Sequence, residues 1–559
     1  VVVLLVLPWP MVYTLFRGAR TTADPSAAQT ANLDPTLKTY PPQVAALRDS
    51  SANYDGNSPW RMHGMLGVRS DGKPHFKYGK TPEPITDGSR DGEMKEHGFY
   101  LRLSDSISLD RNVTDNRHPM CHNEPTDDYD ELPQTSVVFV FYNEAMSTLL
   151  RSIHSVLNRS PPELLKEIIL IDDGSDKPHL GAPLETYIQR LPKVRLVRQP
   201  ERGGLVLARL KGAEVATAET FTVLDSHIEV QEGWLPPLMR RMKGHPERVM
   251  MPMIDSTNPE TFTPGAGGIG CTLGFLWPLV EHSIEVQPND IPPRPVDPVR
   301  SPVMAGGLFT CNRVFFWKLG GYDTDFSFWG AENLEFSFRL WQCGGTLECS
   351  PCSRVYHIFR GHHPYTLPPN SITRNKLRTV TVWMDEYGDI VRKALGNPKM
   401  DLGPLDHMIA LRRRLECKPF SWYMKNVYPT NIFSDLSVLT ALGEIRNVGT
   451  NQCLDSLGHE RNGQSYGLYG CHGQGTTQAF AYLKSTHDIR PIQNLETCLL
   501  PSFRLGPCEA AEAKWDYNSR GHLLNLESAK CMVVTKEGGR MSLKMAPCFS
   551  VGAQLKWKM

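Results

Sequence analysis

The sequence carries no excess of charge of either sign. Its 559 residues contain 60 lysines and arginines and 60 aspartates and glutamates. Overall charge therefore gives no argument for a nucleic acid or an acidic polymer as partner, and any binding of anions must be local. The length exceeds what one hydrophobic core usually supports and predicts roughly three to four domains or segments.

The sequence does not begin with methionine, and its N-terminal apolar run is short. Residues 1–16, VVVLLVLPWPMVYTLF, carry no charge and are followed by Arg17 and Arg20. A membrane-spanning helix needs roughly 20 residues, so this segment is too short unless its start is missing. A signal anchor and a cleaved signal peptide both fit the pattern. Because no clear small-x-small cleavage site follows directly, we favour a signal anchor.

Cysteine, by contrast, is plentiful. The 13 cysteines fit an oxidising compartment better than the cytosol. Asn112-Val-Thr114 is a sequon for N-glycosylation, consistent with luminal exposure, whereas Asn158-Arg-Ser160 is a poorer one because Pro161 follows it. Cys349-Ser-Pro-Cys352 has the spacing of a zinc or redox motif, but no second paired CxxC accompanies it.

The composition divides the chain into segments. Residues 17–96 are rich in Ala, Thr, Asp, Pro and Gly with little apolar periodicity, which predicts a flexible stem, with a small domain as the alternative. From Gln134, apolar runs alternate with helical segments, and this order predicts a mostly parallel sheet with helices on both faces. Strands are expected at 136–141, 167–171, 193–197 and 221–224, and helices at 145–157 and about 205–218.

The C-terminal part has a different predicted fold class from the α/β part before it. From about residue 434, short segments of β character form three weakly similar units. Each unit is bracketed by a pair of cysteines, which are Cys453 and Cys471, Cys498 and Cys508, and Cys531 and Cys548.

The run Phe221-Thr-Val-Leu-Asp225-Ser-His227 brings a carboxylate and an imidazole to the end of a predicted strand. Residues two apart on a strand point to the same face, and open α/β sheets bind ligands at the carboxyl ends of their strands. This mixed oxygen and nitrogen pair suits a divalent metal such as Mn²⁺ better than Mg²⁺. Taken alone, the tripeptide is more typical of a capped strand end with a satisfied histidine.

Two later motifs point to a family. Phe326-Ser-Phe-Trp329-Gly-Ala-Glu332-Asn333-Leu-Glu335 and Val355-Tyr-His357-Ile-Phe-Arg360-Gly-His-His363-Pro-Tyr365 resemble the polypeptide N-acetylgalactosaminyltransferases, which begin mucin-type O-glycosylation. The resemblance runs from about His97 to the C-terminus. It implies a GT-A catalytic domain over 97–433 and a ricin-type β-trefoil lectin domain over 434–559. It also implies a single-pass type II Golgi membrane protein whose anchor and stem are residues 1–16 and 17–96.

The resemblance assigns roles to individual residues. Asp225, His227 and His357 are expected to bind Mn²⁺, which would neutralise charge on the departing UDP. Glu332, Asn333 and Arg360 are expected to act on the transferred sugar and the leaving group. The segment from Arg360 to about Ser371 is expected to be a mobile lid. The remaining donor-site residues are expected to be Asp173, Arg202, Ala305, Gly306, Gly307, Trp329, His363 and Tyr365.

Several of these residues have a structural explanation that needs no ligand. Asp172-Asp173 is typical of a turn with an Asx cap, and Arg202 of a solvated loop. Glu332 and Asn333 could be favoured at a helix N-terminus by the dipole alone. The stripe formed by Leu334, Phe338 and Trp341 is expected to be core.

The resemblance also implies disulfides and a sugar site in the lectin domain. The expected pairs are Cys121–Cys352, Cys343–Cys417, Cys453–Cys471, Cys498–Cys508 and Cys531–Cys548, and Cys271, Cys311 and Cys349 remain without an assigned partner. In the first lectin unit, Asp455, Tyr469 and His472 are expected to bind GalNAc. That unit departs from the family at Thr477 and Phe480, where Asn and Trp are usual. The other two units lack the aspartate, so at most the first unit is expected to bind sugar.

The activity implied is transfer of GalNAc from UDP-GalNAc to Ser or Thr hydroxyls of polypeptides with retention at the anomeric carbon. Double displacement would need a carboxylate beneath that carbon, and Glu332 is the candidate. We favour front-face departure, in which the leaving phosphate takes the acceptor proton. A catalytically idle lectin or folding partner and a transferase of another UDP-sugar are the alternatives. Residues 265–277 and 285–299 differ from the sequence that is usual in the family. The preference for particular peptide acceptors is therefore the property that the resemblance predicts least.

Overall fold

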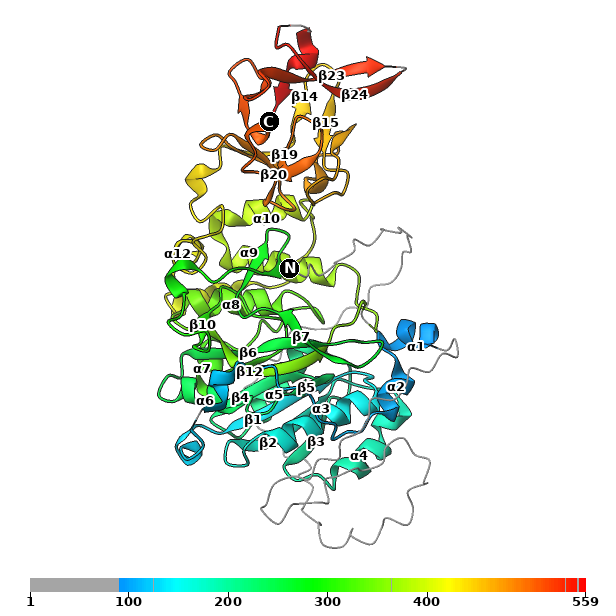
Figure 1. Cartoon of the computed structure of the whole chain (residues 1–559), viewed down its shortest axis with the longest axis vertical. Coiled ribbons are helices and arrows are strands. Elements are labelled where there is room, and N and C mark those ends of the chain that lie inside the picture. The colour runs from blue at the N-terminus through cyan, green and yellow to red at the C-terminus, as the bar shows by residue number, and fades with distance from the viewer. Residues whose placement is uncertain (1–89, 124, 363, 538, 550–551) are drawn as a thin grey trace. The chain divides into compact units, whose positions relative to one another are not determined.

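The computed structural model describes residues 90–123, 125–362, 364–537, 539–549 and 552–559 (Figure 1). The expected signal anchor and most of the expected stem lie outside this range. Within it, no helix is long and apolar enough to cross a membrane. Helix α1 (Arg90–His97) falls inside the segment interpreted as a flexible stem, and α2 (Leu101–Ser106) follows it. The described part of that segment is thus helical rather than unstructured.

The expected catalytic domain is built on one ten-stranded sheet (Figure 1). Its strand order is β10-β12-β6-β11-β4-β1-β2-β3, with β5 paired to β12 and β7 paired to β6. The strands are β1 (Thr135–Phe141), β2 (Leu165–Asp172), β3 (Val194–Arg198), β4 (Thr220–Asp225), β5 (Ile228–Val230), β6 (Arg248–Thr257), β7 (Pro264–Ile269), β10 (Val299–Arg300), β11 (Phe309–Asn312) and β12 (Thr346–Ile358). A separate hairpin joins β8 (Leu273–Leu276) to β9 (Val280–Ser283).

Parallel pairing holds the N-terminal half of the sheet together, as predicted. Strand β1 pairs in parallel with β2 and β4, and β2 pairs in parallel with β3. Strand β6 also pairs in parallel with β12, whereas β5, β7, β10 and β11 add antiparallel pairs. The sheet is therefore mixed, and the carboxyl ends of β1, β2 and β4 share one edge.

The helices predicted at 145–157 and about 205–218 are α3 and α5, and both lie close to those positions. Helix α5 packs tightly on β1, because a Cβ atom added at Gly212 would lie 2.3 Å from Cγ1 of Val138. The stripe Leu334, Phe338 and Trp341 on α8 is buried, which confirms it as core. The helices are α3 (Met146–Arg159), α4 (Ala182–Ile188), α5 (Leu205–Val215), α6 (Pro236–Met242), α7 (Arg313–Lys318), α8 (Glu332–Gln342), α9 (Ser371–Trp383), α10 (Gly388–Ala394), α11 (Asp406–Arg414) and α12 (Phe420–Asn426).

All five expected disulfides are present. A sixth joins Cys271 to Cys349, two cysteines that sequence reasoning left unassigned. Cys349 and Cys352 thus bond to different partners, which excludes both the zinc and the redox interpretation of their CxxC spacing. Cys311 is a buried free thiol, and burial raises its pKa.

The lectin domain contains three similar β units around one buried cluster. In the second and third units an indole N–H donates to a backbone carbonyl, from Trp515 to Leu499 at 2.7 Å and from Trp557 to Met532 at 2.9 Å. In the first unit Phe480 is buried in the same cluster but has no such donor. The strands are β13 (Ala441–Gly443), β14 (Arg446–Asn447), β15 (Gln452–Asp455), β16 (Gly467–Gly470), β17 (Phe480–Leu483), β18 (Asp488–Pro491), β19 (Thr497–Leu499), β20 (Leu505–Pro507), β21 (Trp515–Tyr517), β22 (Leu523–Asn525), β23 (Lys530–Glu537), β24 (Arg540–Ala546) and β25 (Trp557–Lys558).

Candidate active site

Three side chains from two distant parts of the chain meet at the edge of the sheet. Asp225 ends β4, His227 lies in the turn before β5, and His357 lies on β12. One ligand atom from each lies within 4.8 Å of the others. Nε2 of His357 is 3.2 Å from Oδ2 of Asp225, and the two imidazole centroids are 4.8 Å apart. This set can hold one divalent cation.

The local reason for this convergence differs from the predicted one. Sequence reasoning placed Asp225 and His227 on one face of a continuous strand, but β4 ends at Asp225 and His227 follows in a turn. Strand β5 then pairs with β12, with Ile228 opposite His357. The pairing of β5 with β12 therefore brings His227 beside His357.

The electrostatics favour ligand-ready protonation states. Burial would raise the pKa of Asp225, but the hydrogen bond with His357 and the nearby charges of His357, His227 and Arg209 hold it well below its usual range. Burial and the positive charge of Arg360 together lower the pKa of His227 to about 4, against the opposing effect of Glu144. An ionised carboxylate and a neutral imidazole are the forms that bind metals.

The residues present fit Mn²⁺ as a cofactor. One carboxylate and two imidazoles form the mixed donor set expected of a first-row divalent metal. The carboxylate is held in place by close packing, because a Cβ atom added at Gly307 would lie 2.6 Å from Oδ1 of Asp225. At Gly306 a Cβ atom would meet nothing within 4 Å. The backbone of 306 therefore borders open space, as a wall for a bulky donor requires, and Ala305 before it is buried.

Glu144 is a central residue that sequence reasoning missed. It follows β1 by three positions and is 6% exposed. Its carboxylate accepts hydrogen bonds from Nδ1 of His227 at 3.0 Å and from Nη2 of Arg360 at 2.6 Å. Burial would raise the pKa of Glu144, but the charge of Arg360 and the hydrogen bond with His227 hold it well below its usual range. Its position after a buried strand was the one signal in the sequence.

Arg209 is a second missed residue, and it joins the two predicted motifs. This buried guanidinium on α5 donates to Oε1 of Glu332 at 3.1 Å and to the carbonyl oxygen of Gly306 at 2.8 Å. Its Nη2 lies 3.8 Å from Oδ1 of Asp225. Arg209 therefore contacts three parts of the site. These are Glu332, which is expected to act on the sugar, the backbone of Gly306 and the cation ligand Asp225. An arginine inside an apolar helix pattern gave the only hint of this role.

Glu332 and Asn333 open α8 and are both buried. Oε2 of Glu332 accepts from the backbone N–H of Gly330 at 3.0 Å, which is the bond a residue at a helix start would make without any ligand. Burial raises the pKa of Glu332, although Arg209 opposes this. Asn333 donates to the carbonyl oxygen of Met304 at 3.1 Å. The helix-start explanation thus accounts for part of the geometry, while the contact with Arg209 ties Glu332 to the cation cluster.

The two aspartates after β2 do different things. Asp172 bonds the backbone N–H of Ser175 at 2.8 Å and pairs with Arg198, as the Asx-turn interpretation predicts. Asp173 accepts from the backbone N–H groups of Gly203 and Gly204 at 2.8 and 2.9 Å. Burial raises the pKa of Asp173. Its carboxylate therefore fixes the glycine loop beside Arg202.

Arg202 is enclosed by aromatic rings rather than solvated. Its guanidinium carbon lies 4.1 Å from the ring centroid of Tyr142, 4.9 Å from that of Tyr365 and 5.1 Å from that of Phe328. Nη1 donates to the carbonyl oxygen of Thr366 at 3.1 Å. Arg202 and Tyr365 are thereby brought together. Trp329 is half-buried in the segment before α8, and His363 lies outside the described residues.

A guanidinium nitrogen at each of two candidate residues is left without a partner. The Nε atoms of Arg202 and Arg360 are buried and have no hydrogen-bond partner among the residues that the structure describes. Such donors are costly to leave unpaired and are suited to an anionic ligand.

In the first lectin unit, the expected sugar residues are close to one another. Asp455 ends β15 and accepts from Nε2 of Gln478 at 3.0 Å. The same Gln478 accepts from the backbone N–H of His472 at 3.1 Å. Tyr469, on the paired strand β16, is 62% exposed. Tyr469 pairs with Cys453, two residues before Asp455, so the exposed ring and the buried carboxylate belong to the same pair of strands.

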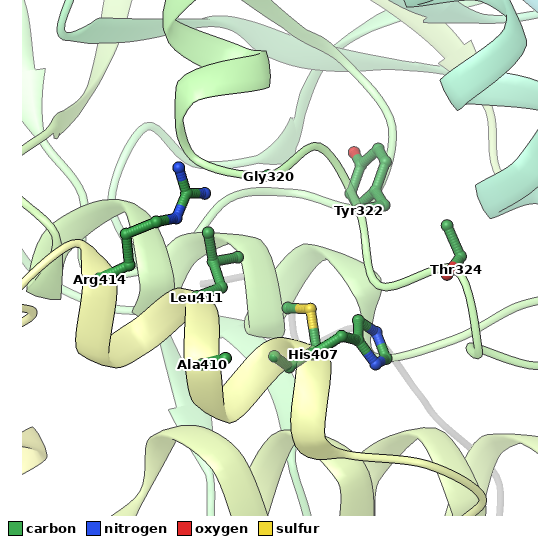
Figure 2. A pocket seen from close by; sticks show the side chains of 8 residues that line it. Gly320, Tyr322, Thr324, His407, Ala410, Leu411 and Arg414 are labelled. Carbon is green, nitrogen blue, oxygen red and sulfur yellow. The ribbon is translucent and has the colours of Figure 1, made fainter. Parts of the chain in front are cut away.

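A cavity of about 320 Å³ lies elsewhere, between α11 and the loop from Gly320 to Thr324 (Figure 2). It shares no lining residue with the cation cluster. Beside it, His407 lies near Asp323 and Asp325 in a second ligand-type group. Both oxygens of Asp323 accept from Arg378, so a guanidinium already neutralises this carboxylate. The group therefore does not resemble the open cluster at Asp225.

Comparison with known proteins agrees with this architecture. The chain matches the models of glycosyl transferase family 2 over residues 136–291, the N-terminal domain of galactosyltransferase over 297–363, and the ricin-type beta-trefoil lectin domain over 441–557. It is 44% identical over 422 residues to human polypeptide N-acetylgalactosaminyltransferase 13, covering 74% of each chain. It is 41% identical over 490 residues to polypeptide N-acetylgalactosaminyltransferase 5 of Caenorhabditis elegans, covering 84% of this chain and 76% of that protein.

A solved structure is similar over most of the chain. The crystal structure of GalNAc-T7 with UDP, GalNAc and Mn²⁺ superimposes with a TM-score of 0.70 at 32% sequence identity. The match covers 86% of this chain and 92% of that one.

Proposed function

Because the chain belongs to the polypeptide N-acetylgalactosaminyltransferase family, we propose that it transfers GalNAc from UDP-GalNAc to Ser and Thr hydroxyls of polypeptides. The observation that carries this proposal is the meeting of Asp225, His227 and His357 within 4.8 Å, next to the Arg209–Glu332 pair. The guanidinium of Arg209 then links the cation ligand Asp225 to Glu332, the buried carboxylate proposed to bind the sugar. A metal-dependent sugar transferase requires such a link.

The cofactor is Mn²⁺, and Asp225, His227 and His357 would hold it. When bound, it supplies positive charge to the diphosphate that leaves with UDP. The protein contributes the preorganised ligands and the buried positive charge around them. Arg360 sits beside this cluster and adds to the positive charge that the leaving group meets.

Nucleotide and sugar have separate binding residues. Asp173 and Arg202 hold the nucleoside end, where Tyr365 stacks against Arg202 and His363 belongs to the same lid segment. The wall of the sugar site is formed by Ala305, Gly306, Gly307 and Trp329. Glu332 and Asn333 hold the GalNAc hydroxyls from the start of α8.

Retention follows from front-face departure. Glu332 is the candidate nucleophile that the sequence offers, but its carboxylate accepts from Arg209 and from the backbone N–H of Gly330. Each oxygen of this carboxylate is therefore already engaged by a donor of the protein. Glu332 therefore binds the sugar, and the departing phosphate accepts the proton of the acceptor hydroxyl.

The lectin domain binds GalNAc at its first unit, through Asp455, Tyr469 and His472. The corresponding residues after the first cysteine of the other units are Leu500 and Val533, which are buried and apolar. Apolar side chains cannot accept hydrogen bonds from sugar hydroxyls. A single sugar site per lectin domain follows.

The chain is a type II protein of the Golgi membrane, anchored by residues 1–16, with both domains in the lumen. The support is chemical. Six disulfides among the described residues are stable in an oxidising compartment and rare in the cytosol. Localisation of the tagged full chain by microscopy tests this part of the proposal.

The activity is tested with UDP-[³H]GalNAc, Mn²⁺ and a panel of Ser/Thr peptides, both naked and already carrying GalNAc. We expect transfer that is abolished by EDTA and restored by Mn²⁺. Competition by unlabelled UDP-GalNAc but not by UDP-glucose or UDP-galactose would exclude another donor. A folded chain that glycosylates none of the peptides would support the idle lectin instead.

A further inference from the structure

Glu144 lies between two parts of the proposed site that are far apart in the sequence. Its Oε2 accepts from Nδ1 of His227 at 3.0 Å, and both of its oxygens lie 2.6 Å from Nη2 of Arg360. We infer that Glu144 is a positioning residue that holds a cation ligand and the lid arginine with one carboxylate. The inference rests on the proposed function and assigns a role to a residue outside the expected ligand set.

The contact with His227 fixes which ring nitrogen faces the cation. A carboxylate can only accept, so Nδ1 of His227 carries the proton and Nε2 keeps its lone pair. The rings of His227 and His357 are 4.8 Å apart. Carboxylate partners of this kind orient metal-binding histidines and make them more basic. Loss of the carboxylate should therefore weaken cation binding without removing a ligand.

The contact with Arg360 fixes the start of the lid. The guanidinium is held between Glu144 and the ring of Phe99, whose centroid is 5.1 Å from Cζ. Gly98 lies against the same side chain, since a Cβ atom there would be 2.9 Å from Cβ of Arg360. If Arg360 leaves this position, the buried carboxylate of Glu144 loses its guanidinium partner. Its movement toward a ligand therefore changes the bonding of Glu144.

Glu144 has little spare capacity to absorb such a change. It also accepts from the backbone N–H of Ala145 at 3.0 Å, from Thr148 Oγ1 at 3.2 Å and from Ser226 Oγ at 3.2 Å. A carboxylate offers about four lone-pair sites. His227 and Arg360 thus donate to the same carboxylate, which has no free acceptor site. A change in the hydrogen bond to Arg360 therefore changes the hydrogen bond to His227.

The test compares Glu144→Gln with a matched control, Glu167→Gln. Glu167 also pairs with an arginine, Arg195, but lies at the opposite end of the sheet. Mn²⁺ affinity is measured by electron paramagnetic resonance of the free ion, which needs no turnover. We expect Glu144→Gln to weaken Mn²⁺ binding roughly 10- to 100-fold, Glu144→Asp to restore part of it, and Glu167→Gln to leave it unchanged. A folded Glu144→Gln variant with wild-type affinity would overturn the inference.

The link between the two contacts is tested by a double-mutant cycle. Glu144→Gln and Arg360→Ala are measured singly and together for UDP binding by calorimetry at saturating Mn²⁺. We expect the combined effect to differ from the product of the single effects by at least about fivefold, as for residues in direct contact. Independent effects would overturn the link. A wild-type chain that binds Mn²⁺ and UDP but transfers no GalNAc would contradict the proposed function. The double-mutant cycle could still be interpreted, because it measures UDP binding and not transfer.

A second inference concerns the two sequons and rests on a separate observation. Asn112 and Thr114 are both exposed, in the irregular segment between α2 and β1. Asn158 lies on α3, where its Nδ2 donates to Oδ1 of Asp110 at 2.7 Å. We infer that Asn112 carries an N-linked glycan and that Asn158 does not.

Glycosylation at Asn158 would conflict with the fold in two ways. A glycan would leave Nδ2 only one hydrogen and would have to fit beside Asp110, which is 3% exposed and also bonded to His154. The sequon hydroxyl of Ser160 is 9% exposed and accepts from Nε1 of Trp234 at 3.0 Å. At Asn112 a glycan would extend into solvent.

The test is peptide mapping of the full chain expressed in a host with a eukaryotic secretory pathway, before and after enzymatic deglycosylation. This inference depends on the proposed luminal location. We expect a glycan on the peptide that contains Asn112, lost in Asn112→Gln, and none on the peptide that contains Asn158. An unmodified Asn112 or a glycan on Asn158 would overturn it. GalNAc transfer is assayed separately, so the two results do not depend on each other.

Discussion

The cation cluster and the first lectin unit are both proposed binding sites built around an aspartate, but they are assembled in opposite ways. Asp225 meets His357 across 132 positions of sequence and Arg209 and Glu144 supply buried charge around them. Asp455 and Gln478 are 23 positions apart, and the ring beside them is exposed. The first site therefore depends on the packing of a whole sheet, whereas the second depends on one local unit.

The largest effect expected from this difference is loss of catalysis without loss of lectin binding. His357→Ala removes one of three cation ligands, and we expect kcat/KM for GalNAc transfer to fall by roughly three orders of magnitude, about 4 kcal/mol of barrier. Binding of free GalNAc to the lectin domain should be unchanged by calorimetry. Loss of both properties would mean that the two sites are not independent.

The buried charge of the first site should also make the catalytic domain sensitive to acid. The pKa of His227 is lowered to about 4 by burial, so between about pH 6.5 and 4 the unfolded state binds the extra proton. Stability of the metal-free protein should rise with pH across this window by up to about 3 kcal/mol. Urea titrations at several pH values measure it, with His227→Gln as comparison. An equal pH dependence in the variant would exclude this origin.

Close packing at the cation site predicts a sharp response to a single methyl group. Gly307→Ala places a Cβ atom 2.6 Å from Oδ1 of Asp225, and the displaced carboxylate should weaken Mn²⁺ binding about 10-fold or more. At Gly92 an added Cβ meets nothing within 4 Å, so Gly92→Ala serves as the control. Equal affinities in the two variants would show that Asp225 does not need its present position.

The lectin site should break locally. In Asp455→Asn, an amide N–H₂ can face the N–H₂ of Gln478, and the pair then loses its hydrogen bond. We expect GalNAc binding by the lectin domain to fall about 10-fold, the effect of one charge-assisted hydrogen bond, with the cation affinity of the catalytic domain as internal reference. A loss of Mn²⁺ binding in this variant would contradict the local character of the site.

The smallest expected effect concerns the aromatic core residue that differs between the lectin units. Trp515→Phe removes the indole donor to Leu499 and makes the second unit resemble the first, where Phe480 occupies the core. We expect the free energy of unfolding to fall by about 1–2 kcal/mol. Thermal unfolding of the lectin domain measures this, and an unchanged transition would mean that the indole bond contributes nothing net.

Sequence reasoning reached the parts of the molecule that depend on local pattern. The strands at 136–141 and 167–171 and the buried stripe of α8 follow from apolar periodicity and were placed within two residues. The five disulfides came from a family pattern. Asp225 and His227 were identified together, although a turn and not a continuous strand directs His227.

What could not be predicted depends on contacts between distant segments. Glu144 meets His227 across 83 positions, and Arg209 meets Glu332 across 123. Neither pair has a spacing that a local pattern could reveal. The pairing of Cys271 with Cys349 has the same cause, because two leftover cysteines become partners only when the loop after β7 is placed against β12. Helix α1 was missed because its eight residues lack a strong apolar stripe.

The central claim is that Asp225, His227 and His357 share one Mn²⁺ that binds UDP. Electron spin-echo envelope modulation of the Mn²⁺–UDP complex reports nitrogen nuclei bonded to the metal. We predict couplings from two imidazole nitrogens in the wild-type chain and from one in His357→Ala. A spectrum without nitrogen couplings, or one that His357→Ala leaves unchanged, would contradict the account.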